Sequence, residues 1–269
     1  GTGKFSLQQQ AIPQSYTPKS SVNACDFDTD GDMDLFIGGR QYPGGYLNPV
    51  SSYILRNDNG KFTDVTAQIA PDLLEIGMVT AAIWSDYNND NKMDLVLCGD
   101  WMPFTIFENT GKQCKNISAT INTVKTDGWW QSVQGSDFDN DGDMDILFLL
   151  SQRDNTPPSI LYVNNGSGVF TAKNLKIPSL KGLSSFSIAD INKDKLPDIF
   201  IGQLWSEYPA SGPDLLPSFL LLNNGSNDFI DNTSSMQNRQ SRRSRGSEWV
   251  DFDNDGDLDL FITNYLLEH

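Results

Sequence analysis

Histidine is almost absent from this chain: among its 269 residues the one histidine is the last, His269. The rest of the sequence therefore cannot build a Ser–His–Asp or Cys–His nucleophile system, or a zinc site based on imidazole. The ending at residues 267–269, Leu-Glu-His, resembles the remnant of a polyhistidine tag. We therefore leave it out of the fold reasoning.

Cysteines and long apolar runs are also scarce. Cys25, Cys98 and Cys114 are too few and too scattered for a disulfide framework. Cys25 and Cys98 stand in apolar runs, and we expect them to be small core residues. No stretch approaches the ~18 consecutive apolar residues that a membrane helix needs, so no membrane span is expected in this segment.

Positive charge is in short supply too. Lys and Arg total 19 against 35 Asp and Glu, which gives a net charge of −16. The one basic cluster, residues 239–245, is interpreted as a solvated loop, with a site for an anionic glycan or a carboxylate-rich partner as the alternative. Because no extended basic face is present, we expect no nucleic-acid binding.

An aspartate-rich loop followed by a short apolar run is what the chain has in abundance. The loop occurs five times, at residues 26–34, 86–94, 137–145, 190–198 and 251–259, and its first aspartates are 60, 51, 53 and 61 residues apart. A period of this size over nearly the whole sequence is typical of a repeat array. We therefore predict a single domain over residues 1–266.

The spacing within the loop suits calcium. Asp26, Asp28 and Asp30 alternate along a tight loop, so their carboxylates can converge, and Gly31 at position six permits the sharp reversal. Asp34, at position nine, closes the shell from the start of the next strand. Calcium takes six to eight oxygen ligands in flexible geometry, whereas magnesium is less suited to this many carboxylates.

Each loop is predicted to supply side-chain oxygens from positions one, three, five and nine, and a backbone carbonyl from position seven. The side-chain ligands are Asp26, Asp28, Asp30, Asp34, Asp86, Asn88, Asp90, Asp94, Asp137, Asp139, Asp141, Asp145, Asp190, Asn192, Asp194, Asp198, Asp251, Asp253, Asp255 and Asp259. The carbonyl ligands are Asp32, Lys92, Asp143, Leu196 and Asp257. Solvated Asx turns are the alternative for any single copy, but five copies at matched offsets favour calcium, Ca2+, with up to five ions.

The five loops are not expected to be equivalent. Loops 86–94 and 190–198 carry Asn at position three, which removes one charge, and Asn91 or Lys195 in place of the glycine. We predict the strongest binding in the other three loops and the weakest in 190–198, where Lys193 and Lys195 also repel a cation. The loops hold 21 of the 35 acids, and five calcium ions would leave a net charge of about −6.

The residues around each loop predict strands. One apolar or alternating run precedes the loop, a second follows it, a third ends in an Asn/Gly turn such as residues 164–166, and a fourth comes after the turn. Four such runs make a four-stranded antiparallel unit of propeller-blade size. The prediction is an all-β chain: a β-propeller of four-stranded antiparallel blades, with five repeats visible, belonging to a longer protein.

The D-x-D-x-D-G-x-x-D loop leading into an apolar strand, with the N-G-x-F-x-D-V-T hairpin within residues 57–66, resembles the FG-GAP/VCBS repeat family. That family includes the calcium-bearing blades of the integrin α-chain propeller. Residues 38–103 are also similar to bacterial FG-GAP proteins of the ASPIC/UnbV-associated type. The resemblance covers roughly residues 3–266 and implies a β-propeller, commonly of seven blades, with calcium in the loop between the first two strands of each blade.

These features favour binding over catalysis. The calcium loops take up nearly every clustered acid, so a pair of carboxylates for glycoside hydrolysis is not singled out. Exposed tryptophans, among them Trp101, would stack on sugar rings or anchor a protein, although filling gaps between blades is the alternative. We predict an extracytoplasmic adhesion module for a protein or glycan ligand. A polysaccharide-active lyase or hydrolase on the same scaffold, and a purely structural module, remain as alternatives.

Overall fold

The structure is a computed structural model that describes residues 6–7, 11–13, 18–41, 44–45, 48–121, 128–150, 159–175, 182–203, 218–225, 228–236 and 243–265. The ending at 267–269 and residues 239–242 of the basic cluster lie outside the described residues. No helix in the described part of the chain is long and apolar enough to cross a membrane. Each of the three cysteines is buried and free, as the sequence indicates.

Four blades of four antiparallel strands follow one another along the chain with their strands in sequence order, and pairing of β6 with β9 joins the second and third blades into one eight-stranded sheet. Blade one contains β1 (Lys19–Cys25), β2 (Asp34–Gly39), β3 (Tyr53–Asp58) and β4 (Lys61–Asp64). Blade two contains β5 (Met78–Ser85), β6 (Asp94–Met102), β7 (Thr105–Asn109) and β8 (Cys114–Asn116). Blade three contains β9 (Gly128–Ser136), β10 (Asp145–Leu150), β11 (Ile160–Asn164) and β12 (Phe170–Asn174).

Blade four contains β13 (Leu183–Ala189), β14 (Asp198–Gln203), β15 (Phe219–Asn223) and β16 (Phe229–Asp231). The described part of the fifth unit is the pair β17 (Arg243–Val250) and β18 (Asp259–Tyr265). Helical segments are short: α1 (Thr66–Ile69) and η1 (Pro71–Glu75) after blade one, and η2 (Thr233–Ser235) after blade four. The all-β prediction and the four-stranded antiparallel blade are therefore confirmed.

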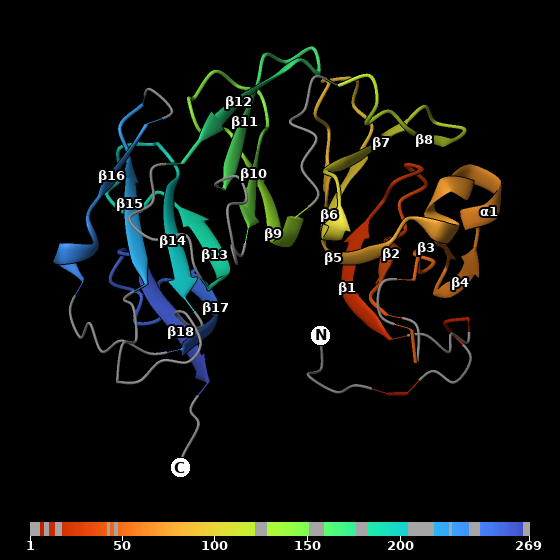
Figure 1. The fold of residues 1–269 in the computed structure, drawn as a ribbon, viewed down its shortest axis with the longest axis horizontal. Coiled ribbons are helices and arrows are strands. Elements are labelled where there is room, and N and C mark those ends of the chain that lie inside the picture. Colours follow the sequence, from red (N-terminus) through yellow and green to blue (C-terminus); the bar gives the residue numbers. More distant parts are fainter. Residues whose placement is uncertain are drawn as a thin grey trace.

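The blades fan out in an open arc, from blade one at one end to β17 and β18 at the other (Figure 1). The first strands β1, β5, β9, β13 and β17 lie next to one another in turn along the arc. In a propeller this is the place of the strands nearest the axis. The arrangement is propeller-like, as the repeat predicts.

The second strands of blades two, three and four lie inside their sheets and are covered on both faces. All six residues of β10, DILFLL, are buried, and β14 shows the same pattern. A strand buried on both sides reads as a continuous apolar run rather than an alternating one. The outer strands β4 and β16 are short and largely exposed.

Apolar clusters join each blade to the next. The first cluster packs Phe36 of blade one against Leu95 and Leu97 of blade two, while Val96 faces the other way, into the cluster with blade three. This alternation follows the pleat of the strand. Blades three and four share a third cluster built in the same way.

The last described blade leaves the corresponding face uncovered. Phe252 and Phe261 are 72% and 63% exposed. The residues at the same repeat positions in blade one, Phe27 and Phe36, are buried by blade two. The exposure of Phe252 and Phe261 therefore reflects the absence of a following blade among the described residues.

Candidate metal centres and ligand surface

The five aspartate loops share one backbone shape, organised by the aspartate at position one. In loop one, the carboxylate of Asp26 accepts hydrogen bonds from the N–H groups of Asp30 at 3.1 Å and Gly31 at 3.0 Å. The same pair of bonds reaches Asp86, Asp137, Asp190 and Asp251 in the other loops. Position one thus uses both oxygens of its carboxylate to fix the turn, as Asx-type hydrogen bonding does.

The turn requires left-handed backbone at two positions, four and six. Gly31 has φ of +97°, as the glycine at position six predicts. The non-glycine residues Asn91 and Lys195 hold the same position at +63° and +73°. Position four is also left-handed, and sequence reasoning missed it. The sequence signal for a left-handed position four is the Asn that three loops have at this position, because Asn tolerates left-handed backbone. Lys193, at φ of +61°, gives no such signal.

Position nine is the most buried part of each of the first four loops. Asp34 is fully buried, and its two oxygens accept the N–H groups of Phe27 at 3.1 Å and Asn57 at 2.7 Å. Burial raises the pKa of Asp34 to about 6 and those of Asp94 and Asp145 to about 7. A buried carboxylate is held ionised when a cation or hydrogen-bond donors compensate its charge.

Asp94 lacks part of that compensation. Its Oδ1 accepts the N–H of Asn109 at 2.6 Å, while Oδ2 is buried and has no hydrogen-bond partner among the described residues. Buried polar oxygens are rarely left in this state. An oxygen that faces the loop without a donor fits a metal ligand, because a metal ion supplies the missing positive charge.

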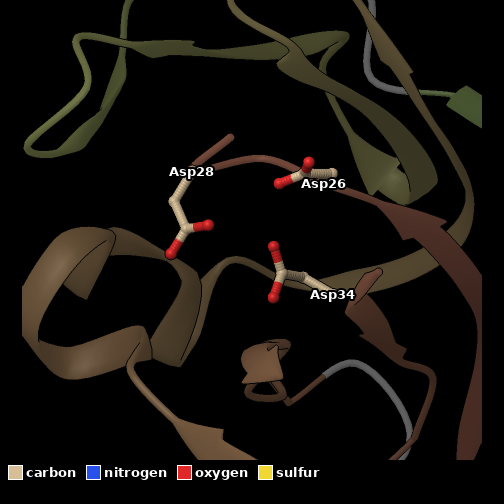
Figure 2. A group of neighbouring side chains, drawn as sticks. All are labelled: Asp26, Asp28 and Asp34. Carbon is tan, nitrogen blue, oxygen red and sulfur yellow. The ribbon is translucent and has the colours of Figure 1, made fainter. Parts of the chain in front are cut away.

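Three of the loops bring three carboxylates together. In loop one, Asp26, Asp28 and Asp34 have ligand oxygens within 4.8 Å of one another, and Figure 2 shows the three carboxylates directed at one shared space. The same holds for Asp137, Asp139 and Asp145 in loop three, and for Asp251, Asp253 and Asp255 in loop five. These are the three loops for which the sequence predicts the strongest binding. The sequence-predicted ligands Asp30, Asp141 and Asp259 lie outside these groups of three.

Loops two and four carry features that oppose a cation. The Nζ of Lys92 lies 2.7 Å from Oδ2 of Asp90, the residue at position five. In loop four, Asn192 turns its amide Nδ2 to Asp194 at 2.9 Å. Lys193 instead reaches out of its own loop to Asp257 in loop five, at 2.5 Å. An ammonium or amide group next to a carboxylate takes the place that a metal ion would use.

Position seven donates its backbone N–H to the carboxylate at position five in every loop. The donors are Asp32, Lys92, Asp143, Leu196 and Asp257, at distances of 2.9–3.0 Å. This bond holds positions five and seven together. The carbonyl role predicted for position seven stays a prediction. Two of these side chains act elsewhere: Asp32 accepts the N–H of Asn59 and Asp143 accepts the side chain of Asn89, both at 2.7 Å.

An asparagine at the end of each third strand completes the loop, and sequence reasoning read it only as a turn residue. Asn57, Asn109, Asn164 and Asn223 each donate their backbone N–H to the position-nine carboxylate of their own blade, at 2.6–2.8 Å. Their side-chain oxygens accept the N–H of the glycine of the following turn, at 2.7–3.2 Å. The available signal was the glycine that follows each asparagine, two residues later in blades two to four and three residues later in blade one.

A second feature lies at the other end of β6. Trp101 is 53% exposed, holds φ of +57° inside a strand, and meets Trp129 edge to face with ring centroids 5.7 Å apart. Such backbone strain in a bulky residue costs about 1–3 kcal/mol and is typical of functional positions. Trp101 stands seven residues beyond Asp94, about 23 Å along the strand, so it lies far from the aspartate loop of its blade.

The surroundings of Trp101 break the repeat. β6 is longer than the other second strands and pairs with β9 of the next blade at Asp100–Trp129 and Met102–Gly128. Asp100, buried next to Trp101, forms an ion pair with Arg40 of blade one at 2.7 Å. This face of blades one to three therefore combines an exposed tryptophan, packed on the half-buried Trp129, with a fixed charged pair.

A cavity of about 180 Å³ lies between blades one and two, beside loop one. Phe27, Val65 and Ile69 form its apolar part, and Gln68, Gln113 and Lys112 form its polar part. Its volume is below that of sites for drug-sized ligands. It suits at most a single sugar ring or one side chain.

Comparison with known proteins agrees with this geometry. Residues 86–148 and 137–201 each match the model of the FG-GAP-like repeat. A lectin structure from Agrocybe aegerita, described as specifically recognising non-reducing terminal N-acetylglucosamine, is similar with a TM-score of 0.54 and 18% identity. The match covers 90% of this chain and 60% of the lectin chain. No curated protein matches.

The blades and their ordered packing define the class as a β-propeller-like fold. The two family matches, each of which includes two aspartate loops and the strands around them, specify the type of repeat. Residues 86–201 are thus similar to FG-GAP-like repeats, which supports an FG-GAP-repeat β-propeller, as the motifs indicate. At 18% identity the likeness to the lectin bears on the fold alone.

Proposed function

We propose that this chain is a calcium-stabilised β-propeller module that binds a glycan or protein ligand outside the cytoplasm. The observation that carries the calcium part is the loop geometry. Three loops gather three carboxylates within 4.8 Å, and Asp94 of a fourth has a buried oxygen without a donor. Without a cation, so many converging carboxylates repel one another and resist ionisation.

Calcium would supply positive charge at the point where each blade turns from its first strand to its second. Positions one, three, five and nine would hold the ion. The ion's chemistry here is structural, because it neutralises the loop and fixes both strands to it. Millimolar calcium outside the cytoplasm would load even weak sites, and FG-GAP repeats are typical of extracellular proteins. Both points support an extracytoplasmic location.

The ligand part rests on Trp101 and Trp129. The exposed ring of Trp101, held against the half-buried Trp129, offers a flat apolar surface for a sugar ring or for a side chain of a protein partner. The strained backbone of Trp101 is stabilised by the rest of the fold and keeps the indole on the surface. The fold likeness to a lectin that recognises terminal N-acetylglucosamine supports testing sugars first.

Two measurements test the proposal. Thermal melting with calcium and with EGTA tests calcium binding. We expect a higher melting temperature with calcium, and equal melting temperatures would refute calcium stabilisation. A glycan array that includes terminal N-acetylglucosamine tests the ligand, with Trp101→Ala as the variant. Ile230→Ala, which removes an apolar side chain of similar exposure on blade four, is the matched control. Binding that survives Trp101→Ala unchanged would contradict the assigned surface.

A further inference from the structure

The asparagine at the end of a third strand reaches two calcium loops at once. In blade two, the backbone N–H of Asn109 binds Asp94 of loop two at 2.6 Å. Its side-chain Nδ2 donates to the carbonyl of Met93 in the same loop at 3.2 Å, and to the carbonyl of Phe27 in loop one at 2.8 Å. The side chain of Asn109 thus binds position two of loop one and position eight of loop two, and its backbone N–H binds position nine of loop two.

The same bridge recurs between the other blades. Asn164 donates to the carbonyl of Tyr87 in loop two at 2.6 Å, and Asn223 donates to that of Phe138 in loop three at 2.7 Å. We call Asn109, Asn164 and Asn223 the bridging asparagines. Asn57, their counterpart in blade one, donates its side chain to Met33 of its own loop at 2.9 Å and has no preceding loop among the described residues.

The residue at position two strengthens each bridge with its ring. Phe27 stacks on Trp84 of blade two with centroids 6.0 Å apart. Tyr87 and Phe138 contact Phe170 and Phe229 of their following blades at 5.8 and 5.9 Å. Position two therefore binds the next blade through both its carbonyl and its ring. It lies between two of the metal-binding positions of its own loop, so a shift of the loop moves both contacts.

We propose that the bridging asparagines couple adjacent calcium loops, so that an ion in one loop raises the affinity of the next. An ion that orders loop two would hold Asp94 and Met93 in place and thereby orient the side chain of Asn109. That side chain would then hold the carbonyl of Phe27 and reduce the ordering that an ion must impose on loop one. The inference rests on the proposed calcium function and adds a route for communication along the arc, which acts equally in both directions.

Amide NMR of the full chain during a calcium titration tests the coupling, because each loop has its own reporter. The N–H of Gly31 binds Asp26 in loop one, and the N–H of Asn91 binds Asp86 in loop two. Because loop one is expected to fill before loop two and the coupling is reciprocal, disabling loop one with Asp28→Ala should raise the calcium midpoint read at Asn91 by about fivefold or more. With Asn109→Ala present, the same change in loop one should leave that midpoint within about twofold.

Asn57→Ala is the matched control, since it removes an equivalent side chain without touching a bridge between loops; the fivefold effect should persist in it. If Asn109→Ala does not fold, Asn164→Ala takes its place, and the effect of disabling loop three with Asp139→Ala is read at Asn91. The comparison of the wild type with Asp28→Ala needs neither variant. Independent midpoints in that comparison, or coupling that survives Asn109→Ala, would overturn the inference and leave calcium binding intact. An absence of calcium-induced shifts at both reporters would instead refute the proposed function.

Discussion

Asp94 offers the sharpest single substitution, because its effect should change sign with calcium. Its carboxylate is fully buried, with one oxygen bonded to Asn109 and the other without a donor. Burial raises its pKa from 3.8 to about 7. At about 1.4 kcal/mol per unit, ionising it at pH 8 without a cation costs at most about 4 kcal/mol.

Asp94→Asn removes this charge while keeping the shape of the side chain. The amide must itself be buried, so we expect a net gain of about 1–3 kcal/mol in the calcium-free protein at pH 8. For a chain of this size, 2 kcal/mol corresponds to about 4–8 °C in melting temperature. With calcium, the variant loses an ionised ligand of loop two. If calcium is present at about 100 times its dissociation constant, losing that site removes about 2.7 kcal/mol of stabilisation.

The assay is differential scanning calorimetry at pH 8 in EGTA and in calcium. We expect Asp94→Asn to melt above the wild type in EGTA and to gain less from calcium. Asp58→Asn is the control, since Asp58 is an exposed carboxylate paired with Arg56 outside the loops. It should change both melting temperatures by the same small amount. If Asp94→Asn destabilises the protein equally in both conditions, Asp94 is a structural hydrogen-bond acceptor and the reasoning is refuted.

Three further outcomes are expected. In EGTA the free energy of unfolding should fall as pH rises from about 4 to about 7. Asp94 and Asp145 have raised pKa values, so the folded chain holds more protons than the unfolded chain in that window. With calcium the free energy of unfolding should instead rise with pH, and denaturation at several pH values would show both trends. Phe138→Ala should cost about 3–5 kcal/mol in urea denaturation, because its ring is fully buried between blades, whereas Phe252→Ala at an exposed ring should cost less than about 1 kcal/mol. Lys195→Gly should stabilise loop four by about 1 kcal/mol, because it removes a non-glycine residue at φ of +73° and a positive charge, and should increase the number of calcium ions bound.

Each of these has a clear contrary result. A stability that rises with pH in EGTA would show that the buried carboxylates are compensated without calcium. Equal costs for Phe138→Ala and Phe252→Ala would contradict the packing of position two on the following blade. A Lys195→Gly variant with unchanged stability and unchanged calcium stoichiometry would show that neither the turn nor the charge limits loop four.

The blades could be predicted from the sequence because their signals are local. A central strand such as β10 follows its loop directly and reads as an apolar run, and the glycine of a loop such as Gly31 lies at a fixed offset from its aspartates. The ranking of the loops was equally local, since it depended on the residues at positions three and six. Pleat, turn and spacing are all properties of fewer than ten consecutive residues, which is why a single sequence is enough to predict the blades and loops.

The contacts between blades could not be predicted from the sequence, because they join residues that are far apart along the chain. Asn109 and Phe27 are 82 residues apart, and nothing near Asn109 distinguishes a bridge between loops from an ordinary hairpin turn. Trp101 was noted as a candidate for a surface, but its left-handed backbone and its contact with Trp129 depend on the pairing of β6 with β9. Such features arise from packing and appear only once the blades are placed.

Calcium stoichiometry measured by native mass spectrometry and isothermal titration calorimetry on the full chain tests the central claim most directly. Three loops gather three carboxylates each, while loops two and four carry opposing groups. We therefore predict that each chain binds at least three calcium ions and that loops two and four fill last. Asp26→Ala should remove one of the tighter ions. A chain that binds no calcium at millimolar concentration, and whose melting is the same in EGTA, would contradict the account.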